Sequence, residues 1–135
     1  MTLQSPQEIG ADLFASIKEL SGKLIERWRR RDRISQRGLG KAVGRTERWI
    51  RELEGGAGTA SLEDHIRCAH ALRRTASHLF IFLFAVEQKM AIPHELLLQD
   101  DLWELERDII DLVSRHQAAA AARLASRGGT ALRPA

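Results

Sequence analysis

Apolar residues recur every three or four positions along most of this chain, a spacing that is typical of amphipathic helices. The first such stretch runs from Ile9 to Leu24. It follows Ser-Pro-Gln-Glu at residues 5–8, which has the composition of a helix start, with a capping serine and a proline in the first turn. The pair Ser21-Gly22 interrupts the pattern, so one long helix and two shorter helices both remain open.

Capping residues and glycines divide the next part of the chain into short helices. Ser35 can cap a helix that ends near Gly44, and Thr46 can cap the helix that follows. Residues 55–60 are rich in glycine and predict a loop, after which Ser61 opens a further helix.

The segment from Leu79 to Val86 is apolar on every side, which predicts that it is buried on every side. Its phenylalanines at 80, 82 and 84 also have the period of a strand, so a helix is favoured and a strand stays open. The segment is far shorter than the roughly 20 apolar residues that span a bilayer. Further along, apolar residues spaced 4, 3, 4 and 3 apart form a heptad seam: Leu98, Leu102, Leu105, Ile109 and Leu112.

These elements predict an all-α protein of four parts. We expect an N-terminal helical extension over residues 1–22 and a central domain over 23–90. A C-terminal helix for dimerisation or packing follows over 91–126, and the remaining residues, 127–135, have the composition of a disordered tail.

Charge is distributed unevenly along the 135 residues. From Lys23 to Arg51 there are eleven basic and three acidic residues, whereas residues 87–111 hold eight acidic and two basic ones. Such asymmetry indicates a surface that binds a polyanion and an acidic region elsewhere. An ordinary solvated helix face is the plainer alternative.

The central basic stretch has the pattern of a helix-turn-helix between Gln36 and Glu54. Two short helices held at a fixed angle need apolar inner faces and a permissive residue at the turn. Gly44 supplies the turn, because glycine adopts a left-handed conformation easily. The inner face would comprise Leu39, Val43, Ile50 and Leu53, and the outward positions of the second helix are Glu47, Arg48, Arg51 and Glu52.

Residues 35–56 resemble the lambda-repressor-like, or Xre-type, family of bacterial and phage regulators. The features that carry the resemblance stand at the family's spacing: Ser35, Gln36, Leu39, Gly44, Ile50 and the Glu54-Gly55-Gly56 end. The family also places an arginine seven residues before the glutamine, and the resemblance implies that Arg29 forms a largely buried ion pair with Glu54. It covers about residues 24–80 and implies a five-helix DNA-binding domain.

Three positions depart from the family pattern. Gly40 stands where the family usually has alanine, at a cost in helix propensity of roughly 1 kcal/mol. Arg45 replaces an apolar residue beneath the turn, and Trp49 replaces a small polar residue.

The resemblance implies roles by position. The candidates for reading bases are Glu47, Arg48 and Glu52, because arginine can donate two hydrogen bonds to guanine and glutamate can accept from cytosine. The candidates for contacting phosphates are Gln36, Arg37, Lys41, Arg45, Thr46 and Arg51.

We therefore expect a sequence-specific transcriptional regulator, with a repressor favoured, that binds an inverted repeat of duplex DNA as a homodimer. The candidate dimer surfaces are Phe80, Phe82, Phe84, Leu98, Leu102, Leu105, Ile109 and Leu112. Packing of the seam within one chain is an equal alternative. A rival function is a protein-interaction module, such as an antitoxin-like adaptor, that uses the acidic C-terminal arm.

Other chemistry finds little support in the residues. His65, Cys68 and His70 lie in one predicted helix with no second cluster to complete a metal site, so we expect neither metal nor cofactor. No spacing suggests an enzyme. The N-terminus lacks the layout of a signal peptide, and the single cysteine fits a reducing compartment, so we expect a cytoplasmic, nucleoid-associated protein of bacterial or phage origin.

Overall fold

The computed structural model describes residues 6–90 and 102–131, and all secondary structure in these ranges is helical. The chain divides into two compact units, residues 1–101 and 102–135. Unit 1 contains the helices α1 (Pro6–Arg31), α2 (Gln36–Val43), α3 (Glu47–Glu54), α4 (Leu62–Ala71) and α5 (Ser77–Glu87), and unit 2 contains α7 (Trp103–Ala131). The predicted all-α class is confirmed.

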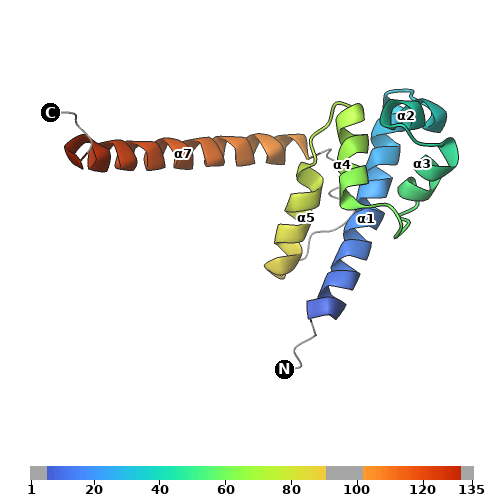
Figure 1. Cartoon of the computed structure of the whole chain (residues 1–135), viewed down its shortest axis with the longest axis horizontal. Coiled ribbons are helices and arrows are strands. Elements are labelled where there is room, and N and C mark those ends of the chain that lie inside the picture. Colours follow the sequence, from blue (N-terminus) through green and yellow to red (C-terminus); the bar gives the residue numbers. More distant parts are fainter. Residues whose placement is uncertain (1–5, 91–101, 132–135) are drawn as a thin grey trace. The chain divides into compact units, whose positions relative to one another are not determined.

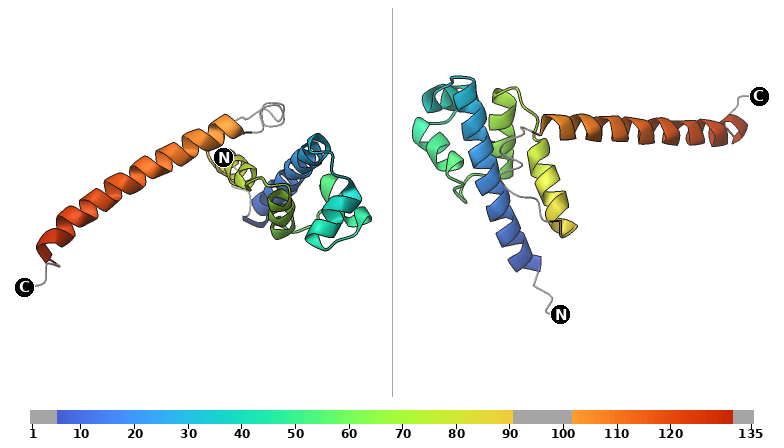
Figure 2. Two further views of the ribbon diagram at one scale, coloured as in Figure 1. Left: turned by 90° about the horizontal axis from the view of Figure 1, so that it is seen from above. Right: turned by 180° about the vertical axis from the view of Figure 1, so that it is seen from behind.

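Helix α1 is the axis around which unit 1 is built. It contacts α3, α4 and α5, and α2 packs on α3 and α4. Figures 1 and 2 show α2 and α3 gathered beside the C-terminal half of α1, with α4 and α5 along another side. The five helices close around buried apolar residues: Ile17, Leu20, Leu24, Ile25, Trp28, Leu39, Ile50, Leu53, Cys68, Ala69, Leu72, Leu79 and Phe82.

Gly22 does not break α1, which is continuous through it. A Cβ atom at this position would lie 2.5 Å from the carbonyl oxygen of Leu53 and 2.7 Å from that of Glu54. The glycine therefore allows the end of α3 to pack directly on the backbone of α1. The boundary expected between residues 22 and 23 falls inside this helix.

The apolar segment from Leu79 to Val86, for which the sequence allowed either a helix or a strand, lies in the helix α5. Phe82 is buried on its inner side, whereas Phe80 and Phe84 are each 64% exposed. Phe82 was expected at a dimer surface, but it packs in the core of its own chain, because successive side chains of a helix point about 100° apart. None of the described helices is long and apolar enough to span a membrane.

Candidate nucleic-acid interface

Two side-chain caps and one glycine define the unit formed by α2, the turn and α3. The Ser35 hydroxyl accepts a hydrogen bond from the backbone N–H of Gly38 at 2.9 Å, which begins α2. Gly44 ends α2 in the left-handed conformation, with φ of 73°. The Thr46 hydroxyl then accepts from the backbone N–H of Trp49 at 3.1 Å and begins α3. The caps satisfy amide groups that a helix start leaves unpaired, so the two short helices have defined ends.

The packing around Gly40 explains why this position departs from the family pattern. A Cβ atom here would lie 2.6 Å from the carbonyl oxygen of Arg45. The turn therefore approaches α2 so closely that alanine, the usual family residue, would displace backbone. The loss of helix propensity at Gly40 thus accompanies a close approach of the turn to α2.

The outward face of α3 is highly charged, and its inward face is apolar. Ile50 and Leu53 are fully buried, whereas the four outward positions predicted from the sequence, Glu47, Arg48, Arg51 and Glu52, are all exposed. Two ion pairs run along this face, with Arg48 Nε 3.2 Å from Glu52 Oε1 and Arg51 Nη2 3.6 Å from Glu47 Oε1. Exposed pairs of this kind contribute only about 0.3–0.5 kcal/mol each, so a ligand can displace them at small cost.

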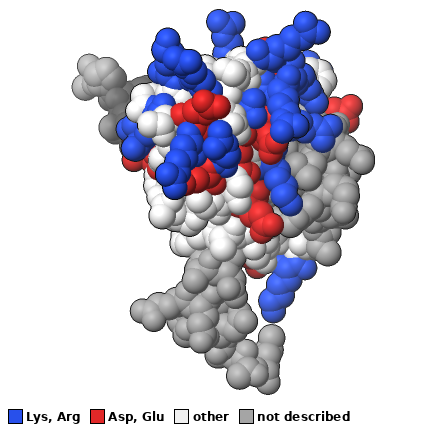
Figure 3. Space-filling model, turned by 90° about the vertical axis from the view of Figure 1, so that its right-hand side faces the viewer, with Lys and Arg blue, Asp and Glu red and all other residues white. Residues whose placement is uncertain are grey.

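Basic side chains surround this charged face of α3. Five of the six residues predicted to contact phosphates are exposed: Arg37, Lys41, Arg45, Thr46 and Arg51. The sixth, Gln36, is half-buried. Figure 3 shows lysines and arginines gathered over the upper part of the molecule on this side, with some acidic side chains between them.

Arg45 and Trp49, the other two departures from the family pattern, contact each other. The guanidinium of Arg45 lies over the Trp49 ring, 4.8 Å from its centroid, and one nitrogen is 3.6 Å from the Asp64 carboxylate. Asp64 also accepts from the backbone N–H of Ser61 in the capping box of α4. Arg45 thus joins the turn to the start of α4 by an aromatic contact and an ion pair, where the family pattern has an apolar contact.

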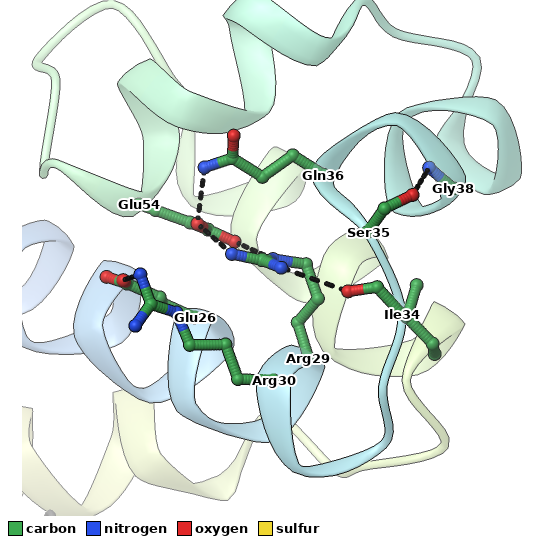
Figure 4. A network of polar contacts seen from close by, with 8 residues as sticks. All are labelled: Glu26, Arg29, Arg30, Ile34, Ser35, Gln36, Gly38 and Glu54. Atoms are coloured by element: carbon green, nitrogen blue, oxygen red, sulfur yellow. Dashed lines mark hydrogen bonds and ion pairs between the residues drawn. The ribbon is translucent and has the colours of Figure 1, made fainter.

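A buried ion pair connects the end of α1 to the end of α3, as the resemblance implied (Figure 4). Arg29 donates from Nε to Glu54 Oε2 at 2.6 Å and from Nη2 to Glu54 Oε1 at 3.0 Å. Its third nitrogen donates to the carbonyl oxygen of Ile34 at 2.9 Å. The hydrogen bond with Glu54 raises the pKa of Arg29 despite the opposing effect of burial. The two hydrogen bonds between Arg29 and Glu54 thus satisfy polar groups of both side chains inside the fold.

Gln36 extends this network in a way that the sequence did not predict. Its side-chain amide donates to Glu54 Oε1 at 3.0 Å (Figure 4). The residue expected at a phosphate is therefore held by Glu54 at the first turn of α2. Since an amide has two N–H groups and an oxygen, this contact leaves it with chemical capacity for a second partner.

A second buried polar cluster joins α1, α4 and α5. The Ser21 hydroxyl lies 2.8 Å from Nδ1 of His65 and 2.8 Å from Nε2 of His78. Burial lowers the pKa of each imidazole to about 4, so both are neutral at pH 7. His78 also forms a T-shaped contact with Trp28, with the ring centroids 5.2 Å apart. No sequence pattern pointed to this cluster, because its members are far apart along the chain.

The residues considered for a metal site are separated in space and environment. Cys68 is buried, and burial raises the pKa of its thiol to about 12, while His70 is exposed. His65 belongs to the cluster with Ser21. The described residues contain no group of three or more side chains suited to hold a metal ion.

The candidate dimer residues differ in exposure. Phe80, Phe84, Leu105, Ile109 and Leu112 are exposed by 38–64%. Phe82 and Leu102 are buried. Leu98 lies outside the described residues.

Comparison of the chain with protein-family models, curated proteins and solved structures gave no match. The geometry described above is therefore the basis on which a function can be proposed.

Proposed function

We propose that this chain is a sequence-specific DNA-binding transcriptional regulator of the lambda-repressor-like type, with a repressor favoured. In this proposal α3 enters the major groove, and Glu47, Arg48 and Glu52 read base edges. The chain, encoded by a bacterium or a phage, acts in the bacterial cytoplasm as a homodimer on an inverted repeat.

One observation carries the proposal, namely that α3 presents a charged outer face from a rigidly held support. Its inner residues, Ile50 and Leu53, are fully buried, and the Arg29–Glu54 pair fixes its end to α1. A recognition helix needs this combination, since base reading requires donors and acceptors at defined positions.

The charges around α3 also support the proposed DNA-binding function. Arg37 and Lys41 on α2 and Arg51 on α3 are exposed beside the charged face of α3. Basic side chains around a base-reading helix contact phosphates and set the register of the protein on the duplex.

The decisive experiment compares two arginines in matched surroundings. Arg48 on α3 and Arg67 on α4 are both exposed, and each forms an ion pair with the glutamate four residues before or after it. We expect Arg48→Ala to lower the preference for specific over scrambled duplex by roughly 5- to 100-fold. Arg67→Ala should leave the preference unchanged.

The measurement is fluorescence anisotropy with labelled duplex from upstream of the gene that encodes the chain, and with a scrambled duplex of equal length. Equal effects of the two substitutions would show that α3 does not read bases. Absence of binding to either duplex at moderate salt would contradict the DNA-binding proposal itself.

An alternative function rests on α7. This helix exposes Leu105, Ile109, Leu112 and Val113, and its first half is acidic. A protein-interaction module of the antitoxin or adaptor kind would use this surface to bind a partner protein. Salt-sensitive binding to duplex DNA distinguishes the two functions, because the interaction module does not require it.

A further inference from the structure

Helix α7 carries an apolar stripe that is exposed in the single chain. Leu105, Ile109, Leu112 and Val113 are spaced three or four residues apart and are 38–51% exposed. Residues at this spacing share one side of a helix. Most helices in proteins are stabilised by packing of such a side against a partner, so a covering surface is required.

The charges of α7 are divided between its two halves. The acidic residues all lie in the first half: Glu104, Glu106, Asp108 and Asp111. One arginine, Arg107, lies among them. From Arg115 to the end of α7 the lysine, arginine, aspartate and glutamate positions are all arginine: Arg115, Arg123 and Arg127. A second copy of α7 laid antiparallel would place opposite charges together, whereas a parallel copy would place like charges together. Antiparallel helix dipoles add to this preference.

Side-chain size follows the same division. Leucine, isoleucine and valine dominate the stripe in the first half, and the second half contains the run of alanines from Ala118 to Ala122. In an antiparallel pair, large side chains of one copy meet small ones of the other, so the two backbones can approach closely. A parallel pair would leave the alanines facing each other.

One antiparallel register satisfies charge and size together. When Asp108 lies beside Arg123 of the second copy, Leu112 lies beside Ala119 of that copy. Arg123 is 18 residues, or five helical turns, beyond Leu105, so it lies on the side of the stripe. Its long side chain can therefore reach across to a carboxylate at the edge of the stripe.

We infer that α7 pairs antiparallel with α7 of a second copy of this chain, with Asp108 of each copy facing Arg123 of the other. In this register Trp103 of one copy lies beside Gly128 of the other, so the two Trp103 residues are about 37 Å apart at 1.5 Å per residue. The pairing does not depend on the proposed function, because it needs no DNA.

Charge reversal in the full-length chain tests the pairing. We expect Asp108→Lys and Arg123→Glu each to raise the dimer dissociation constant about tenfold or more, because two attractive contacts per dimer become repulsive. The double variant D108K/R123E should return close to the parent value, since both contacts are attractive again. Mixing the two single variants should likewise give a heterodimer. Analytical ultracentrifugation without DNA measures dimer formation by the two single variants, the double variant and the mixture.

Cysteine cross-linking tests the orientation. A mixture of Leu112→Cys and Ala119→Cys chains should form a disulfide between chains, whereas Leu112→Cys chains alone should not. Cys68 is buried, and the high pKa of its thiol keeps it from reacting, so it does not interfere. Cross-linking of Leu112→Cys with itself would show a parallel pair and overturn the inference.

The outcomes separate the inference from the proposed function. A parent chain that is monomeric at micromolar concentration overturns the pairing, even if the DNA preference depends on Arg48. A dimer that responds to the charge reversals supports the pairing, even if no duplex is preferred. In the latter case α7 would serve the interaction function instead.

Discussion

At the scale of single residues, the smallest side chain sets the position of α3. Gly22 in α1 and Gly40 in α2 each face backbone carbonyl groups at a distance that a Cβ atom cannot occupy. Both glycines lie inside helices, where alanine would be favoured by up to about 1 kcal/mol if space allowed. Close packing therefore outweighs helix propensity at both positions.

Gly22→Ala should destabilise the protein by about 2 kcal/mol or more. The added Cβ would meet the carbonyl oxygens of Leu53 and Glu54 at 2.5 and 2.7 Å. Displacing this backbone costs more free energy than the higher helix propensity of alanine contributes. Gly58→Ala is the matched control, because no atom lies within 4 Å of its added Cβ. Urea unfolding followed by circular dichroism compares the two. Equal midpoints would contradict the close approach of α3 to α1.

At the scale of the elements, buried polar groups connect helices that the apolar core alone would leave free to slide. The Arg29–Glu54 pair joins α1 to α3, and Ser21 joins α1 to His65 on α4 and His78 on α5. Such contacts specify one arrangement of the helices, since any shift would leave a buried polar group unsatisfied.

The histidine cluster predicts loss of stability in acid. An unfolded histidine titrates near 6.5, and burial lowers the pKa of His65 and His78 to about 4 in the folded protein. The unfolded state therefore binds more protons between these values, so the free energy of unfolding falls as pH decreases from about 6.5 to 4. The full contribution, on the order of 3 kcal/mol for each histidine, is present above pH 6.5.

Urea unfolding at a series of pH values measures this dependence. The exposed His70 provides the control, and His70→Gln should leave the decline between pH 6.5 and 4 unchanged. A free energy of unfolding that stays constant over this interval would show that burial does not lower the pKa of His65 and His78.

At the scale of the whole molecule, charge is the feature that bears on function. The basic residues gather around α2 and α3 (Figure 3), and the first half of α7 is acidic. In the proposed complex, four exposed basic side chains beside the charged face of α3 contact phosphates: Arg37, Lys41, Arg45 and Arg51. A dimer would thus neutralise about eight phosphates, with release of the counterions that accompany them.

The affinity of the proposed dimer for DNA should therefore fall steeply with salt. About eight phosphate contacts predict a slope near −7 in a plot of log binding constant against log salt concentration. Arg37→Ala should reduce the slope by about 1 per copy and weaken specific and scrambled duplex alike. Arg67→Ala should leave it unchanged. A slope near zero for the parent chain would exclude phosphate contacts as a main source of affinity.

The boundaries of α2 and α3 and the charged outer face of α3 follow from the sequence alone. The expected end of the C-terminal helix at residue 126 does not hold, because α7 continues to Ala131. Caps and turns depend on local chemistry, so Ser35, Thr46 and Gly44 have the same roles in the structure as in the pattern. The Arg29–Glu54 contact was also foreseen, although only through the resemblance to a family.

Tertiary structure decided the features that depend on residues far apart in the chain. Gly22 looked like a helix break, because nothing near it in the sequence shows that α3 packs against it. The Ser21–His65–His78 cluster left no pattern for the same reason. Residues 79–86 of α5 are all apolar, so periodicity could not tell buried Phe82 from its exposed neighbours, and only the packing of α5 on α1 made that distinction.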